Sequence, residues 1–162
     1  MPRKSKEQKT EKKIVTKPPI WHFVDVNGEI LGRVSTKIAK LLIGKGKPDY
    51  TPNIQMGDKV VVTNAANIKV TGKKLKQKIY YRYTGYHGSV KAEKLEDLLK
   101  RDPRKVIERA VRGMLPRNKL MKRRMANLYI FPGMEHPHKA HEKKVEPKDI
   151  KTTKGALENK EK

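Results

Sequence analysis

Residues 59–63 read Lys-Val-Val-Val-Thr, a continuous run of β-branched side chains between two polar ends. A strand with one wet face alternates apolar and polar residues, whereas an uninterrupted run suits a strand buried on both faces. Strands of this kind lie in parallel or mixed sheets beneath helices. The run therefore predicts the central strand of a layered α/β domain.

Strands and helices alternate on both sides of this run, as an α/β domain requires. Val34, Ile38, Leu41 and Leu42 form one apolar stripe at helical spacing, and Gly44 is a plausible end for that helix. The pattern predicts further strands at residues 21–26, 68–71, 80–84 and 128–131, and helices within residues 31–44, 91–100 and 103–116.

The composition points to a polyanionic partner. The chain has 162 residues, with 40 Lys and Arg against 17 Asp and Glu, a formal net charge of +23. The positive charges of a free domain with that charge repel one another, and nucleic acid is the polyanion that most commonly neutralises them. The absence of Cys excludes a disulfide framework, a thiolate zinc site and a Cys nucleophile. No apolar run is long enough for a membrane span, and no signal peptide is recognised.

The two ends of the chain differ from its middle. Residues 1–19 hold seven Lys and Arg and two Glu, and we expect a basic arm that is disordered when the protein is free. The arm is either a solvated charged end or a segment that orders on a phosphate backbone. Residues 20–150 are expected to form the folded domain, and residues 151–162 a charged tail.

Two long segments contain bases and no acid. The first acid-free segment, residues 59–92, carries eight Lys and Arg together with a tyrosine-rich and glycine-containing loop. The second acid-free segment, residues 109–134, carries seven bases around a Gly-Pro break. A solvated helix face usually mixes charge signs, so these segments favour RNA or DNA phosphates as partners. Some of the tyrosines are expected in the core and others against bases or phosphates.

Two other clusters give weaker signals. Residues 44–47, Gly-Lys-Gly-Lys, lack the spacing of a nucleotide-binding loop and indicate a flexible basic loop. Residues 135–142 hold three His, but Pro137 interrupts any helix that would align them, and the nearby Lys would repel a cation. These His are interpreted as hydrogen-bond donors to phosphate or backbone. No catalytic set, metal site or cofactor site is predicted.

Four motifs occur in order along the chain: WxxxDxxGxxLGR at residues 21–33, VTGKK with YYRYTGY at residues 70–86, GMLPRNKL at residues 113–120 and EHPH at residues 135–138. Over about residues 20–150 the chain closely resembles the bacterial type of the ribosomal large-subunit protein thirteen family. The resemblance implies a three-layer α/β/α domain around a mostly parallel four-stranded sheet, with basic loops and flexible tails.

The resemblance also implies a function. Members of the family are structural constituents of the large ribosomal subunit that bind its RNA early in assembly, without enzymatic activity. The implied partners are large-subunit ribosomal RNA and neighbouring ribosomal proteins, with no membrane and no small-molecule substrate. The implied location is the cytoplasm, within the ribosome, and an organellar ribosome stays open.

The expected RNA contacts lie in loops. By resemblance they are Lys73, Lys74, Lys78, Arg82, Tyr83, Gly85, Tyr86, Arg112, Pro116, Arg117, Asn118, Lys119, His136, Pro137 and His138, and the charge pattern adds Lys122, Arg123 and Arg124. One departure is that His87-Gly88-Ser89 follows TGY where the family usually has Pro-Gly-Gly. The detailed shape of that loop is therefore not carried over.

Two other functions are weighed against ribosomal RNA binding. A DNA-binding or chromatin-type protein would match the charge, but no helix-turn-helix, zinc finger or basic zipper is visible. A small enzyme acting on RNA would need a convergent acid–base or metal set, which the sequence does not offer.

Overall fold

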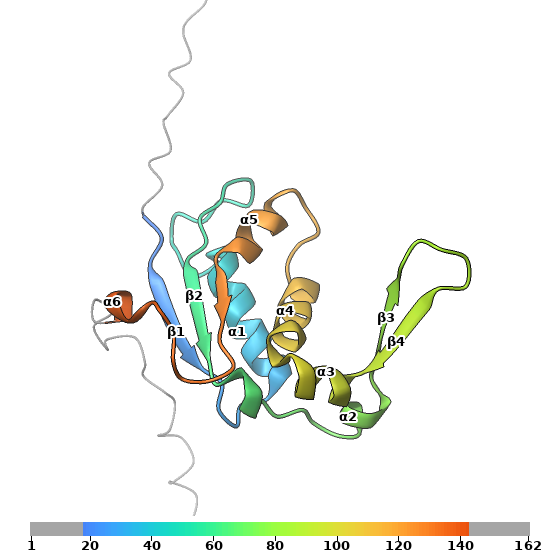
Figure 1. Cartoon of the computed structure of the whole chain (residues 1–162). Helices are drawn as coiled ribbons and strands as arrows, with labels where there is room; N and C mark the ends of the chain where they lie inside the picture. The colour runs from blue at the N-terminus through green and yellow to red at the C-terminus, as the bar shows by residue number, and fades with distance from the viewer. Residues whose placement is uncertain (1–17, 143–162) are drawn as a thin grey trace, which may run out of the picture.

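The computed structural model describes residues 18–142, and at its centre is a sheet of three parallel strands (Figure 1). Strand β2 (Lys59–Thr63) lies between β1 (Trp21–Asp25) and β5 (Leu128–Ile130). The three valines of β2 are fully buried, which confirms the α/β prediction made from this run. The expected arm, apart from residues 18–19, lies outside the described residues, and so do residues 143–150 of the expected domain and the expected tail.

The sheet has three strands where four were expected. The predicted strand at residues 68–71 forms a single bridge between Ile30 and Lys69. Its backbone is bonded to the chain leading into the first helix, through Lys69 N to Glu29 O and Leu31 N to Lys69 O, and not to a strand of the sheet. Strands β3 (Ile79–Tyr83) and β4 (Val90–Lys94) pair with each other as a separate antiparallel hairpin.

Helices α1 (Leu31–Ile43) and α4 (Pro103–Met114) cover one face of the sheet (Figure 1). The apolar stripe of α1 is confirmed, because Val34, Ile38 and Leu42 are buried, and Leu41 lies at its edge. Gly44 ends the helix with a left-handed φ of 82°, a conformation that favours glycine. The other helical segments are η1 (Ala65–Asn67), α2 (Lys74–Gln77), α3 (Leu95–Arg101), α5 (Leu120–Ala126) and α6 (Lys139–Glu142).

The helix predicted over residues 91–100 is wrong in its first half. Residues 90–94 form β4, and helix α3 begins only at Leu95. The sequence Lys-Ala-Glu-Lys has good helix propensity, but its backbone pairs with β3 across the hairpin, and that tertiary contact outweighs the local preference. The strand expected at residues 80–84 lies one residue earlier than predicted, as β3.

The other face of the sheet is covered by the chain that follows β5, including α6 (Figure 1). The Trp21 ring stacks on the His141 ring at a centroid distance of 4.2 Å and on Tyr129 at 5.7 Å. His136 is buried against Phe23 and Phe131, with ring centroids 5.5 and 5.9 Å away. This aromatic cover is the thin third layer of the expected α/β/α arrangement.

A buried carboxylate ties the loop after α1 to the first strand. Asp58 accepts hydrogen bonds from the Ile20 backbone N–H at 3.0 Å and from Lys47 Nζ at 2.5 Å, and it also bonds His22 Nε2 at 3.1 Å. Lys47 is therefore held inside the fold, while Lys45 on the same loop is exposed. The Gly-Lys-Gly-Lys loop is thus partly structural.

Gly57 gives the first test of this packing. A Cβ added at Gly57 would lie 1.9 Å from the Leu42 carbonyl oxygen, whereas a Cβ at Gly46 meets nothing within 4 Å. Gly57→Ala should lower the free energy of unfolding by about 3 kcal/mol or more, because backbone must shift. Gly46→Ala should stay within about 0.5 kcal/mol. Urea unfolding compares the two, and equal stability of both variants would contradict the packing described.

Asp58 gives a test by pH. Burial alone would raise the pKa of Asp58, but its hydrogen bonds to His22, Lys47 and Ile20 outweigh burial and hold the pKa below the ordinary 3.8. Because the folded pKa is the lower one, ionised Asp58 contributes stability above its unfolded pKa, and this is lost as the pH falls through the folded value.

Asp58→Asn should therefore cost about 2 kcal/mol at pH 7, the size of a charged hydrogen bond, and should reduce the loss of stability between pH 5 and about 3. Urea unfolding of both proteins across that range is the measurement. An unchanged acid dependence in the Asn variant would show that another group is responsible.

Candidate nucleic-acid interface

The fold brings the two acid-free segments together at Arg109, on the outer side of α4. The Arg109 guanidinium lies over the Tyr80 ring of β3 at 4.8 Å, and Lys78 Nζ lies 5.2 Å from the same ring. Cations over an aromatic ring are attracted by its electron-rich face. This contact links the hairpin of the first segment to the helix of the second.

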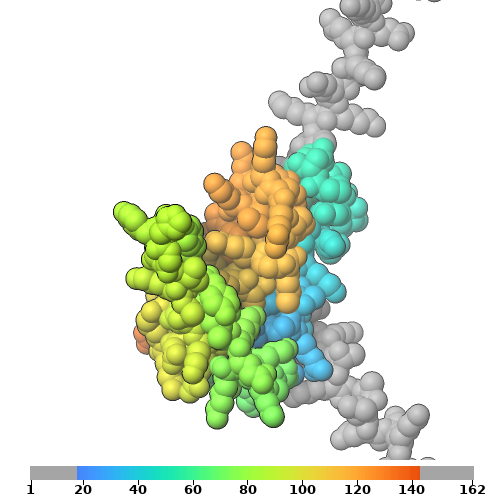
Figure 2. Space-filling view, turned by 90° about the vertical axis from the view of Figure 1, so that its right-hand side faces the viewer, coloured from blue at the N-terminus to red at the C-terminus, as the bar shows by residue number. Residues whose placement is uncertain are grey.

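Three hollows share Arg109 and together form what we call the Arg109 groove. The largest, about 700 Å³, lies at the end of α4 and includes Arg112, Arg117 and Lys119 in its lining. A second, about 410 Å³, lies beneath the hairpin and includes Tyr80, Arg82 and Lys91. A third, about 390 Å³, adds Lys74 and Lys78. Figure 2 shows the hairpin and the α4–α5 connection on either side of this recess.

The carboxylates near the groove are already paired. Glu93 bonds Arg101 Nη2 at 2.6 Å, and Glu108 bonds Arg112 Nη2 at 3.0 Å. Arg117 and Lys119 are exposed and make no ion pair with another described residue. Cations that lack internal partners are available for phosphate groups, which Arg binds in a bidentate geometry.

The structure places most of the predicted RNA contacts on this side of the molecule. Lys73, Lys74 and Lys78 are exposed on α2 and at its ends, and Arg82, Tyr83, Gly85 and Tyr86 are exposed on the hairpin and its loop. Arg112, Arg117, Asn118 and Lys119 line the groove, and Pro116 is exposed between them. Lys122 and Arg123 are exposed on α5.

Four of the predicted contacts lie apart from the groove: Arg124, His136, Pro137, which is exposed, and His138. Arg124 has only 1% of its surface exposed, and its Nε and Nη1 atoms have no hydrogen-bond partner among the described residues. His136 is buried in the aromatic cover of the sheet, and His138 is half-buried between Trp21 and Tyr129. In this conformation the side chains of Arg124 and His136 are buried, and their RNA contacts remain predictions.

His138 has a further property that bears on phosphate binding. Burial lowers the pKa of His138, and the nearby His136, His141 and Lys59 lower it further. A neutral imidazole can donate one hydrogen bond to a phosphate but attracts it only weakly by charge. Packing of the sheet therefore explains the EHPH run at least as well as RNA contact does.

Sequence reasoning placed Arg109 in the second acid-free segment but did not select it as a contact. Arg109 precedes Arg112 by three residues on α4, a spacing that puts both side chains on one face of a helix. That spacing is the feature of the sequence from which Arg109 could have been predicted as an RNA contact. The partner Tyr80 comes from a hairpin distant in sequence, so only the fold identifies the pair.

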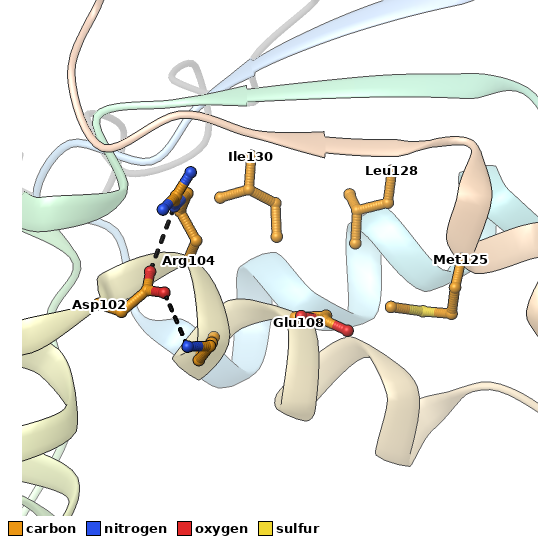
Figure 3. A pocket seen from close by; sticks show the side chains of 7 residues that line it. Asp102, Arg104, Glu108, Met125, Leu128 and Ile130 are labelled. Atoms are coloured by element: carbon orange, nitrogen blue, oxygen red, sulfur yellow. Dashed lines mark hydrogen bonds and ion pairs between the residues drawn. The ribbon is translucent and has the colours of Figure 1, made fainter.

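The hollow between α4 and β5 contains the acids that most resemble a catalytic pair (Figure 3). Asp102 bonds Arg104 Nε at 3.2 Å and lies 3.3 Å from Lys105 Nζ, while Glu108 is held by Arg112. Burial would raise the pKa of Asp102, but hydrogen bonds from Arg104 and Lys105 lower it overall. An ionised, doubly paired carboxylate is a poor general acid, so these groups act as ion partners.

The described residues offer neither a metal cluster nor a membrane span. Within residues 18–142 no three His, Asp or Glu side chains are grouped so that they could hold a metal ion. Among the helices described, none is long and apolar enough to cross a bilayer.

Comparisons with known proteins agree on one family. The profile of the family described as Ribosomal protein L13 matches residues 19–137. The chain is 53% identical over 122 residues to large ribosomal subunit protein uL13 of Thermus thermophilus, covering 75% of this chain and 87% of that protein. It is 50% identical over 123 residues to uL13 of Nitratiruptor sp., covering 76% and 88%. With uL13 of Stenotrophomonas maltophilia it shares 49% identity over 125 residues, covering 77% and 88%.

Proposed function

The chain belongs to the ribosomal protein L13 family, and we propose that the Arg109 groove is where it binds large-subunit ribosomal RNA. Family membership makes the protein a structural constituent of the large ribosomal subunit and not an enzyme. Its partners are the subunit RNA and neighbouring ribosomal proteins. Since the relatives named above are bacterial, we place it in the cytoplasm, within the ribosome.

The observation that carries the proposal is the convergence of two acid-free segments on one groove. The hollow beside Arg117 is lined by four bases and contains no carboxylate. In the free protein these charges repel one another, and RNA phosphates remove that repulsion. The groove therefore fits a polyanion better than it fits a small neutral ligand.

The connection between α4 and α5 sets the direction of one key contact. Pro116 follows the end of α4 and restricts its own φ to near −65°, so the chain leaves the helix in a defined direction. The backbone of Arg117 is thereby directed toward the groove, beside Asn118 and Lys119. A guanidinium anchored at this position can make a bidentate phosphate contact.

Because the groove joins hairpin and α4, RNA segments bound to each would be held at a fixed spacing. A protein that binds in this way needs its own folded core before RNA is added, which the buried strand and helices supply. We propose that the chain acts early in subunit assembly by fixing two RNA segments against each other.

The proposal is tested by the salt dependence of RNA affinity. Lys78→Ala and Lys119→Ala should each flatten the slope of log affinity against log salt by about 0.7 to 0.9, the value for one lost phosphate contact. The control is Lys100→Ala on α3. Lys100 is not part of the groove, and its Nζ forms an ion pair with Glu96 at 2.9 Å. Equal slopes for all three variants, or equal affinity for duplex DNA and naked large-subunit RNA, would contradict the proposal.

Arg117→Lys separates geometry from charge. The substitution keeps the charge and loses the planar fork, so incorporation of the protein into large subunits should fall, and Arg117→Ala should impair it further. Both variants should change the free energy of unfolding by no more than about 0.5 kcal/mol, because the side chain is exposed. The control is Arg33→Lys on the exposed side of α1. Full incorporation of Arg117→Lys would mean that charge alone suffices.

A further inference from the structure

The hairpin has an apolar face that nothing in the described structure covers. Of the eight large hydrophobic side chains exposed in the described residues, five lie between residues 79 and 90. Tyr81 is 70% exposed, Tyr83 is 64% exposed and Val90 is 57% exposed. Apolar side chains concentrated on one element usually mark a binding surface.

Strand alternation separates the two faces of the hairpin. Tyr80, Arg82, Lys91 and Glu93 line the hollow under the hairpin, on the side of α3 and α4. Successive side chains of a strand point to opposite faces, so Ile79, Tyr81 and Tyr83 point away from the groove. We call this the outer face of the hairpin.

The two outer tyrosines are free to receive a flat ligand. Tyr81 lies opposite Ala92 and Tyr83 lies opposite Val90, so small or short side chains stand beside each ring. Residues two apart on a strand are separated by about 6.7 Å, which leaves room for a separate ring on each tyrosine. Two adjacent aromatic rings on a sheet surface can stack bases that have been unstacked from one another.

The charges around the outer face favour RNA over an apolar protein segment. No acid occurs from Lys59 to Ala92, and the nearest carboxylate on the hairpin, Glu93, is turned to the inner face and paired with Arg101. Lys94 lies opposite Ile79 on the outer face, at its base, and is exposed. A neutral apolar partner gains nothing from this cation, whereas an unpaired nucleotide offers a ring to the tyrosines and a phosphate to Lys94.

We propose that Tyr81 and Tyr83 stack on the bases of unpaired nucleotides in the large-subunit RNA. This inference rests on the proposed function and names the kind of RNA that the hairpin recognises. The inner face and groove bind phosphates, and the outer face binds bases. The hairpin thus reads single-stranded RNA, a loop or a bulge, because bases within a duplex do not expose their faces.

The test uses the full chain and two RNAs, an oligouridine of about 12 nucleotides and an RNA duplex of the same length. Tyr81→Ala should weaken oligouridine binding by about 5-fold to 100-fold, and Tyr81→Leu should do the same because it keeps apolar bulk without a ring. Tyr81→Phe should retain the affinity. Duplex binding should be unchanged, and so should the salt slope, since no phosphate contact is removed.

Tyr81 is exposed, so these variants should fold normally, and amide hydrogen exchange of the hairpin checks this directly. Unchanged oligouridine affinity in Tyr81→Ala would overturn the proposal, and so would wild-type oligouridine affinity in Tyr81→Leu. Loss of incorporation into subunits without any loss of RNA affinity would overturn it too, and would assign the outer face to a neighbouring protein. None of these outcomes alters the salt-slope result for Lys119→Ala, so the proposed function stands or falls separately.

Discussion

Strand β2 turns neither of its faces toward water, and the arrangement of the other elements follows from covering both. Val60 and Val62 belong to the core formed with α1 and α4, while Val61 is buried outside that core, on the side of the aromatic cover. Each parallel neighbour requires the chain to return to the same end of the sheet. Helix α1 makes that return between β1 and β2, and residues 64–127 make it between β2 and β5.

The second return carries the binding elements. It contains the hairpin, α3, α4 and α5, and only α4 among them is long and buried along one side. Helix α4 is thus both a wall of the core, through Val106, Ile107 and Val111, and the support for Arg109 on its outer side. Packing of the core and positioning of the groove depend on the same helix.

Charge is distributed so that the fold tolerates a formal net charge of +23. Several carboxylates are engaged in ion pairs within the fold: Asp58 with Lys47, Glu93 with Arg101, Asp102 with Arg104 and Lys105, and Glu108 with Arg112. Among the described cations that make no ion pair with another described residue are Arg117 and Lys119 in the groove and Lys122 and Arg123 on α5. The domain therefore folds on hydrophobic burial, and its excess charge is left for a polyanion.

The sequence alone determined the buried central strand, the two long helices, the acid-free segments and the family, because hydrophobic periodicity and charge are local properties.

Tertiary structure decided the remaining strands, the buried polar side chains and the groove. Pairing with β3 made residues 90–94 a strand despite their helix propensity, and bonding to the start of α1 kept residues 68–71 out of the sheet. Burial of His136 also depended on Phe23, which lies far away along the chain. The meeting of Tyr80 and Arg109, and the exposure of Tyr81 on the opposite face, arise only when the hairpin is placed against α4. Such contacts join residues distant in sequence, so no local pattern encodes them.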